Sequence, residues 1–292
     1  MSQDPAESAG VLVPSAIELE RRAFRRKQGL RSVIISLVST LVFAIVAWVF
    51  VVNTPGWAAV QRTFFNPEVF VQSFPRIGQG FLLNLRVLFF AVIGVFVLAL
   101  LIAAIRTLRG PVFFPLRALA AGYTDLFRGM PLIIVLYLVG FGIPGLIGPT
   151  GPRIPSEVLG TIALVLTYSA YVSEVFRAGI EAVHPSQRLA ARSLGLSHGR
   201  TMRLVVLPQA IRKVTPALMN DFVAMQKDVG LISVLGAIDA VRGAQIEVAK
   251  AFNFTPYVVA GLLFVLLALP MIRFIDWYTA RLRAREQIGG IV

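Results

Sequence analysis

Uncharged apolar stretches of about twenty residues constrain this chain more than any other feature. The first runs from Val33 to Val52 without a charged residue. A helix needs about 20 apolar residues to cross the hydrocarbon core of a bilayer, whereas the apolar part of a cleaved secretory signal has about 7–15. We therefore interpret Val33–Val52 as a retained membrane anchor.

Five further apolar stretches follow the first. The composition agrees with a membrane protein, since 57% of the residues are hydrophobic and the mean hydropathy is +0.76, against about 45–50% apolar residues in a soluble domain. The sequence therefore predicts an all-helical membrane protein with about six transmembrane helices. The five stretches are Leu82–Ile105, Leu116–Phe141, Val158–Phe176, Pro216–Ile238 and Pro256–Ile275.

The 28 lysines and arginines are unevenly distributed along the chain. If the N-terminus is cytoplasmic, the inside segments 1–31, 106–117, 177–213 and 273–292 carry 20 of them, and the outside segments and span mouths carry 6. This asymmetry follows the positive-inside rule, and it explains the formal net charge of +13 without a nucleic-acid partner. We predict a multi-pass protein of the cytoplasmic membrane with both termini inside.

Several kinds of chemistry are excluded or disfavoured by the composition. The absence of cysteine excludes disulfides, thiolate metal sites and thiol catalysis. Two histidines, His184 and His198, argue against a multi-histidine metal centre. We predict no catalytic residue and no metal ligand.

A basic stretch from Gln187 to Ala210 interrupts the apolar pattern with four arginines and no acid. Pro185 suits the first turn of a helix, and Gly195 suits the left-handed position that ends one. Ser197 suits the cap of a second helix, which Pro208 would kink or end. The stretch therefore predicts a helix–turn–helix hairpin.

Two uses of this hairpin are open on physical grounds. Apolar residues at helical spacing form a ridge that a partner protein could receive in a groove. Alternatively, the two helices lie on the lipid surface with their arginines facing anionic headgroups.

The segment LAARSLGLSHGRTMRLVVLPQA (189–210) resembles the EAA loop of the permease subunits of ABC importers. Three other segments resemble the polar amino-acid uptake branch of that family. The four segments are collinear within about residues 80–280, and the resemblance favours the partner-docking use of the hairpin. The other segments are YTDLFRGMPLIIVLY (123–137), YSAYVSEVFRAGIEAV (168–183) and NDFVAMQKDVGLISVLG (220–236).

The resemblance implies a type I ABC-importer permease fold, with a five-helix core preceded here by one extra helix. It divides the chain into a cytoplasmic basic tail (1–31), the extra helix with an external loop (32–80), the transmembrane domain (81–280) and a cytoplasmic tail (281–292). The coupling loop would cover about residues 183–212.

The resemblance also implies partners. Two permease copies or paralogues pair in the lipid bilayer, each hairpin docks into a cytosolic ABC ATPase, and an extracytoplasmic solute-binding protein delivers the substrate. ATP and Mg are used by the ATPase, and this chain binds no cofactor, in agreement with its lack of a Gly-x-x-x-x-Gly-Lys-Ser/Thr loop.

We assign the ATPase-coupling role to eight residues of the hairpin. Two of the family's usual residues are replaced, since the motif glutamate falls at Leu189 and the glycine before Gln187 is Ser186. A third departure is Val229-Gly230, where the family has Thr-Ser. The coupling residues are Gln187, Leu189, Ala190, Ala191, Gly195, Arg203, Leu207 and Pro208.

Ionisable groups inside spans are costly and by default mark pathways or pairs. Arg128, beside a helix loosened by Pro131, would attract a substrate carboxylate, pair with Glu174 or Asp125, or extend its charge to the cytoplasmic surface. Glu174 and Arg177, three residues apart on one helical face, favour a local pair over a ligand.

Lys227 and Asp228 lie where the fifth span is expected to break. Broken helices in transporters often build the substrate site, but the two side chains could also contact one another. The complete set of candidates for the translocation path is Arg128, Pro131, Glu174, Lys227 and Asp228.

These observations predict a permease subunit of an ATP-driven importer that forms the path for a polar or charged amino acid. The chain would be a transport subunit and not an enzyme. One rival is an ATP-independent secondary transporter or channel for a small polar solute, which would have no reason for the hairpin. A membrane-embedded enzyme is a second rival, but no catalytic constellation is evident.

Leu189 provides a test of the alignment. We expect Leu189→Glu to leave the assembly with an ATPase intact, because glutamate is the residue that the family usually has there. Co-purification of the two subunits measures this. A complex that falls apart on this change would contradict the alignment.

Overall fold

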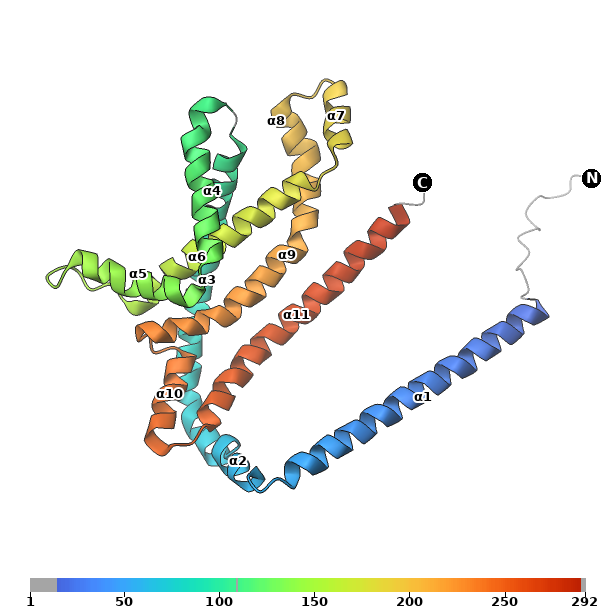
Figure 1. Cartoon of the computed structure of the whole chain (residues 1–292), viewed down its shortest axis with the longest axis vertical. Helices are drawn as coiled ribbons and strands as arrows, with labels where there is room; N and C mark the ends of the chain where they lie inside the picture. Colours follow the sequence, from blue (N-terminus) through green and yellow to red (C-terminus); the bar gives the residue numbers. More distant parts are fainter. Residues whose placement is uncertain (1–14, 109, 290–292) are drawn as a thin grey trace, which may run out of the picture. The chain divides into compact units, whose positions relative to one another are not determined.

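The computed structural model describes residues 15–108 and 110–289, and the regular elements in these ranges are helical (Figure 1). The chain divides into two compact units, one ending at Gln61 and the other beginning at Arg62. Within the described ranges, four helices are long and apolar enough to cross a membrane, or six spans result if each of two bent pairs counts as one. The predicted all-helical membrane fold is confirmed.

Helix α1 (Ala16–Val52) forms most of the first unit. The Ser15 hydroxyl caps it by accepting the Glu18 N–H at 3.3 Å, and the Asn53 amide donates to the Val49 carbonyl at 2.7 Å at its other end. Its apolar side chains are exposed, as lipid-facing residues are. The helix begins well before Val33, so the described part of the predicted tail 1–31 is largely helical, while residues 1–14 lie outside the described ranges.

Helix α3 (Pro67–Thr107) follows the short α2 (Trp57–Phe64) and is longer than the predicted span. Asn66 caps it by accepting the Glu68 N–H at 3.0 Å. Much of the loop predicted before residue 81 is therefore helical, and the predicted boundary at 81 falls inside α3. The predicted tail from 281 likewise continues α11 (Thr255–Gly289), with 290–292 outside the described ranges.

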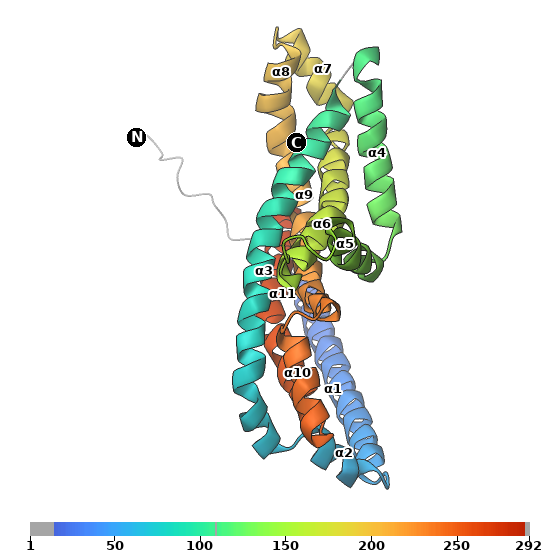
Figure 2. The ribbon, with the colours of Figure 1, turned by 90° about the vertical axis from the view of Figure 1, so that its left-hand side faces the viewer.

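Helix α6 (Ser156–Glu181) lies at the centre of the second unit. It packs against α3, α4 (Phe114–Gly129), α5 (Leu132–Ile147) and α9 (Leu207–Asp228) (Figure 2). The main core cluster includes Val87, Leu88, Ala91, Val135, Leu136, Leu164, Met225 and Ile232. A second cluster joins α3 to α10 (Ala240–Ala251) and α11 through Ile77, Ala240, Ala244, Val259 and Ala260.

The predicted third span is bent, by 110° between α4 and α5. Pro131 causes the break, because it disfavours helical geometry at the residue before it, and Met130 is extended. The four prolines and four glycines of GIPGLIGPTGPRIP (142–155) predict an external loop, but α5 continues to Ile147 with Pro144 inside it. Pro144 has no N–H to donate to the Gly140 carbonyl, and the helix ends within one turn after it.

The predicted fifth span begins earlier than Pro216. Thr215 is helical and its hydroxyl donates to the Ile211 carbonyl at 2.7 Å, so α9 runs without interruption from Leu207. The predicted break is present after Asp228, where a 3-10 segment, Val229–Leu235, leads to Gly236 at φ 88°. The segment from His198 to Leu235 and helix α10 together form a span bent by 52°.

Asn84 of α3 holds this break together. Its amide nitrogen donates to the Val229 carbonyl and to Asp239 Oδ2, both at 3.1 Å, and its amide oxygen accepts the Ala240 N–H at 3.0 Å. Asp239 in turn caps α10 by accepting the Arg242 N–H at 2.8 Å. The Val229 carbonyl and the Ala240 N–H, two backbone groups at the break, thus both find a partner in the Asn84 side chain.

Gly80 lets α3 approach this junction, because a Cβ at this position would clash with the backbone of Asp239 and Ala240. We expect Gly80→Ala to lower the stability by about 1–3 kcal/mol, the usual cost of overpacking. Thermal unfolding of the purified protein in detergent measures the effect. Gly78→Ala is the control, since its nearest neighbour would be Phe74 Cε1 at 4.0 Å; an equal loss at both positions would contradict the assignment.

Candidate coupling hairpin and translocation path

The predicted hairpin is present between α6 and α9. Its first arm is α7 (Pro185–Ser193), and its turn contains Gly195 at φ 80°. The second arm is α8 (His198–Thr201), which begins after Ser197 and continues into a π-helical turn, Met202–Val206. The positions predicted for Pro185, Gly195 and Ser197 are confirmed, although the Ser197 side chain makes no capping bond.

Pro208 does not end the second arm, contrary to one of the two predicted outcomes. The Leu207 N–H donates to the Met202 carbonyl, which is the wider hydrogen-bond spacing of a π-helix. Pro208 follows this π-helical turn directly, and the change of hydrogen-bond spacing accommodates its missing N–H within a helix that continues from His198 into α9.

Most of the eight predicted coupling residues are exposed on the hairpin. Leu189 is 65% exposed, and the neighbouring Leu194 is 83% exposed. Ala191 is buried, so it supports the hairpin from within. No acidic residue occurs between Glu181 and Asp221, which gives the hairpin an apolar and basic surface. The other exposed or partly exposed coupling residues are Gln187, Ala190, Gly195, Arg203, Leu207 and Pro208.

The base of the hairpin is fixed to the end of α6. The Arg188 guanidinium donates to the Ile180 carbonyl, and the Lys213 ammonium donates to the Ala182 carbonyl at 2.6 Å. Both cations lie where a helix leaves unpaired carbonyls and a partial negative charge. Val183, Val206 and Ala210 form a small buried cluster beneath them.

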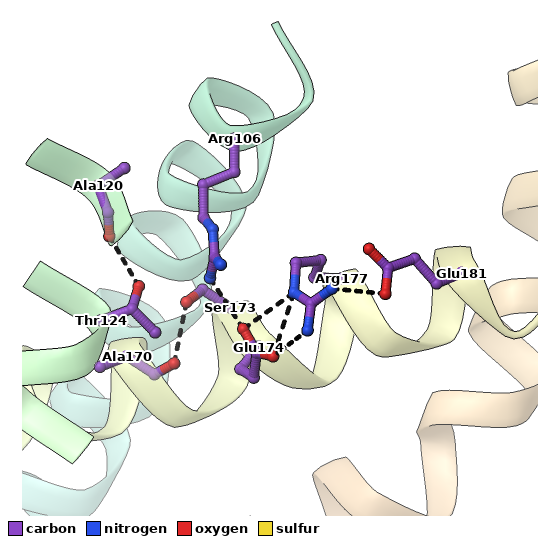
Figure 3. Close-up of polar contacts among 8 residues, drawn as sticks. All are labelled: Arg106, Ala120, Thr124, Ala170, Ser173, Glu174, Arg177 and Glu181. Atoms are coloured by element: carbon purple, nitrogen blue, oxygen red, sulfur yellow. Dashed lines mark hydrogen bonds and ion pairs between the residues drawn. The ribbon is translucent and has the colours of Figure 1, made fainter. Parts of the chain in front are cut away.

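Glu174 forms an ion-pair network at this end of α6 (Figure 3). Its Oε2 accepts from Arg106 Nη1 of α3 at 2.8 Å, and the Nε of Arg177 is 3.1 Å from both carboxylate oxygens. Arg177 also pairs with Glu181. The predicted local pair of Glu174 and Arg177 is present, and Arg106 is a partner that the sequence reasoning missed.

Arg128 and Lys227 are exposed, and neither takes part in an ion pair within the described part of the chain. The alternative pairing of Arg128 with Glu174 or Asp125 is therefore wrong in this structure, and Glu174 pairs with Arg106 and Arg177. The alternative contact between Lys227 and Asp228 is not formed either. Pro131 lies at the bend between α4 and α5.

Asp228 is instead bonded to α6. The Tyr168 hydroxyl donates to Asp228 Oδ2 at 2.7 Å. One turn along, the Tyr171 hydroxyl donates to the Arg128 carbonyl at 3.1 Å. The two tyrosines thus connect α6 to both broken spans at the points where those spans break.

A cavity of about 150 Å³ lies beside Tyr168, between α3, α6 and α9. Asp221 lines it, and its Oδ2 is buried without a hydrogen-bond partner. Thr167 Oγ1 and Gln226 Oε1 are also buried without partners. Such atoms are rare in proteins, because most buried polar groups are hydrogen-bonded to protein or to water.

Tyr168 and Asp221 were not among the predicted site residues. The signal for Asp221 is its position as an acid inside the fifth apolar stretch, beside Lys227 and Asp228. No comparable signal exists for Tyr168, because its role depends on the packing of α6 against α9. Among residues 15–108 and 110–289, no three His, Asp or Glu side chains are grouped so that they could hold a metal ion.

Comparisons with known proteins agree with this geometry. The family model described as binding-protein-dependent transport system inner membrane component matches residues 111–284, which include the hairpin and both bent spans. The arginine transport system permease protein ArtQ of Bacillus subtilis is 34% identical over 202 residues, which cover 68% of this chain and 89% of that protein. A probable glutamine ABC transporter permease protein of the same organism is 30% identical and covers 74% and 98%.

Solved structures share the fold. A crystal structure of an amino acid ABC transporter with histidines is 34% identical, covers 72% of this chain and 96% of that chain, and has a TM-score of 0.66. An inward-facing structure of the MetNI methionine ABC transporter has 17% identity and a TM-score of 0.52, which supports the fold alone.

The hydrogen bond from Tyr168 to Asp228 can be compared with the hydrogen bond that Tyr171, on the same helix, donates to the Arg128 carbonyl. We expect Tyr168→Phe to lower stability by about 1.5–3 kcal/mol, because a hydrogen bond to a charged group is lost. Tyr171→Phe, which loses a bond to a neutral carbonyl, should cost about 1 kcal/mol. Thermal unfolding of both variants measures the difference, and a larger loss for Tyr171→Phe would contradict this account.

Proposed function

Because this chain belongs to the family of binding-protein-dependent transport system inner membrane components, we propose that it forms the translocation path of an ABC importer for polar amino acids. The observation that carries the substrate class is the identity with an arginine permease across most of both chains. A glutamine permease and the amino acid transporter with histidines are similar over the same region.

The candidate path suits a zwitterionic substrate, which carries an ammonium group and a carboxylate. Asp221 and Asp228 supply carboxylates on α9, and Asp221 keeps one oxygen without a partner beside the cavity. These carboxylates would receive an ammonium group. The exposed cations Lys227 and Arg128, near the two helix breaks, would receive a carboxylate. Glu174 is excluded from this role by its two arginine partners.

The hairpin would dock into a groove of a cytosolic ABC ATPase, which uses ATP and Mg. Its exposed leucines fit an apolar groove, and its arginines fit acidic residues at the rim of that groove. The eight coupling residues keep their proposed role, with Ala191 as internal support. A second copy or paralogue of this chain and an extracytoplasmic solute-binding protein complete the transporter.

The hairpin end of the second unit would face the cytoplasm. The connection between α3 and α4 lies at the same end as α7 and α8, and α10 lies at the opposite end (Figure 2). Arg106 in the last turn of α3 and Arg117 in the first turns of α4 flank that connection and thus add to the positive charge of the hairpin end. The positive-inside rule supports a cytoplasmic position for this end, and the charge distribution along the sequence supports the proposal that both chain termini are inside.

ATP dependence is the decisive test. We expect uptake of a radiolabelled polar amino acid into vesicles that contain the permease, its co-purified ATPase and its binding protein. Inactivation of the ATPase should abolish uptake, because this chain has no phosphate-binding loop of its own. Uptake that persists without ATP hydrolysis would support the rival, a secondary transporter or channel.

A further inference from the structure

We propose that the ion pair between Arg106 and Glu174 transmits movement of the hairpin to α3, so that both are positioning residues for transport. This inference rests on the proposed function, since it needs an ATPase that moves the hairpin. It assigns Glu174 a mechanical role outside the substrate path.

The hairpin and the end of α6 form one rigid body. Arg188 on the first arm and Lys213 on α9 both cap carbonyls at the end of α6. Gly179 of α6 lies so close to α9 that a Cβ there would clash with Val214. A displacement of the hairpin must therefore carry the end of α6 with it.

The ion pair is the electrostatic connection from this rigid body to α3. Among the described residues, Arg106–Glu174 is the only ion pair that joins α6 to another helix. Arg106 and Glu174 have side chains 20% and 19% exposed, so solvent screens their attraction less than that of a surface pair. Arg177 stays on α6 itself and neutralises the second oxygen of the carboxylate.

An apolar groove separates α3 from α9 beside this pair. Its volume is about 430 Å³, and it is lined by Leu100 and Ala104 of α3 and by Met202, Leu207 and Ile211 of the hairpin base and α9. The hairpin end of α3 therefore packs against α6, where the ion pair lies, and borders the open groove on the side of α9.

The opposite half of α3 is fixed. Asn84 ties it to the break between Asp228 and α10 through three hydrogen bonds. A helix fixed at Asn84 and pulled at Arg106 will pivot, and the groove will open or close. This arrangement connects the hairpin to the broken span that carries the candidate path.

The alternative is that the ion pair between Arg106 and Glu174 only stabilises the packing of α3 against α6. It would affect stability but would not affect how much substrate is moved for each ATP hydrolysed. The measurement that separates the two roles is therefore the ratio of transport to ATP hydrolysis in the assembled transporter, together with the width of the groove.

The test uses the complete transporter in lipid nanodiscs and proteoliposomes. The chain has no cysteine, so Ala104→Cys and Ile211→Cys place one spin label on each side of the groove. We expect the distance between the labels to change on ATP binding. Arg106→Gln should abolish that change and lower transport per ATP by at least about fivefold, a typical coupling between sites.

Three variants make the result specific. Arg106→Gln leaves Glu174 paired with Arg177, so no buried charge is orphaned. Arg106→Lys keeps the charge and should restore most of the coupling. Glu181→Gln removes the other carboxylate partner of Arg177 and should leave the ratio and the distance change as in the parent.

The proposal is overturned if Arg106→Gln keeps both the parent's ratio of transport to ATP hydrolysis and the parent's change in label distance on ATP binding. Equal loss of coupling in Glu181→Gln would overturn it as well, because the effect would then not be specific to α3. If the Arg106→Gln variant does not fold, Glu174→Asp, which shortens the carboxylate, is tested in its place. A ratio of transport to ATP hydrolysis equal to that of the parent in Glu174→Asp would then overturn the proposal. Failure of any ATPase to co-purify with the parent chain would instead contradict the proposed function.

Discussion

A bilayer offers no water to the backbone, so each N–H and carbonyl group that leaves a helix must find a partner in the protein. Asn84 meets this requirement at the break between α9 and α10, where one side chain supplies two donor bonds and one acceptor. This side chain thus stabilises the break by pairing backbone groups that the helix no longer pairs. The break places Lys227 and Asp228 at the end of α9.

Charged side chains inside the protein also need partners there, as the backbone groups do. Glu174 and Asp228 have partners from other turns or helices, through Arg106, Arg177 and Tyr168. Asp221 departs from the rule because one of its oxygens is buried beside a cavity without a partner. The two arginine partners of Glu174 give it a structural role, whereas under the proposed function Asp221, together with Asp228, would receive the ammonium group of a substrate.

Local patterns were enough to predict the spans and the hairpin turn. The span Val33–Val52 could be predicted from hydropathy alone. The turn at Gly195 could be predicted from one backbone angle that glycine adopts without strain. The 110° bend at Pro131 and the continuity of α9 through Pro216 were missed because proline permits both a break and a first turn or a kink. The pairing of Arg106 with Glu174 could not be predicted, because 68 residues separate the partners.

The two ends of α3 are held by different kinds of interaction, and the difference suits movement. The hydrogen bonds of Asn84 are short, directional and buried, so they tolerate little displacement. An ion pair acts over longer distances and with less dependence on angle, so Arg106 and Glu174 can stay attracted while their helices shift. The groove beside them lies between α3 and α9, so a shift that keeps α3 packed on α6 meets little close packing on the side of α9. α3 is thus held by directional hydrogen bonds near the proposed substrate path and by an ion pair and helix packing near the hairpin, which is the order that the proposed transmission from the cytoplasm requires.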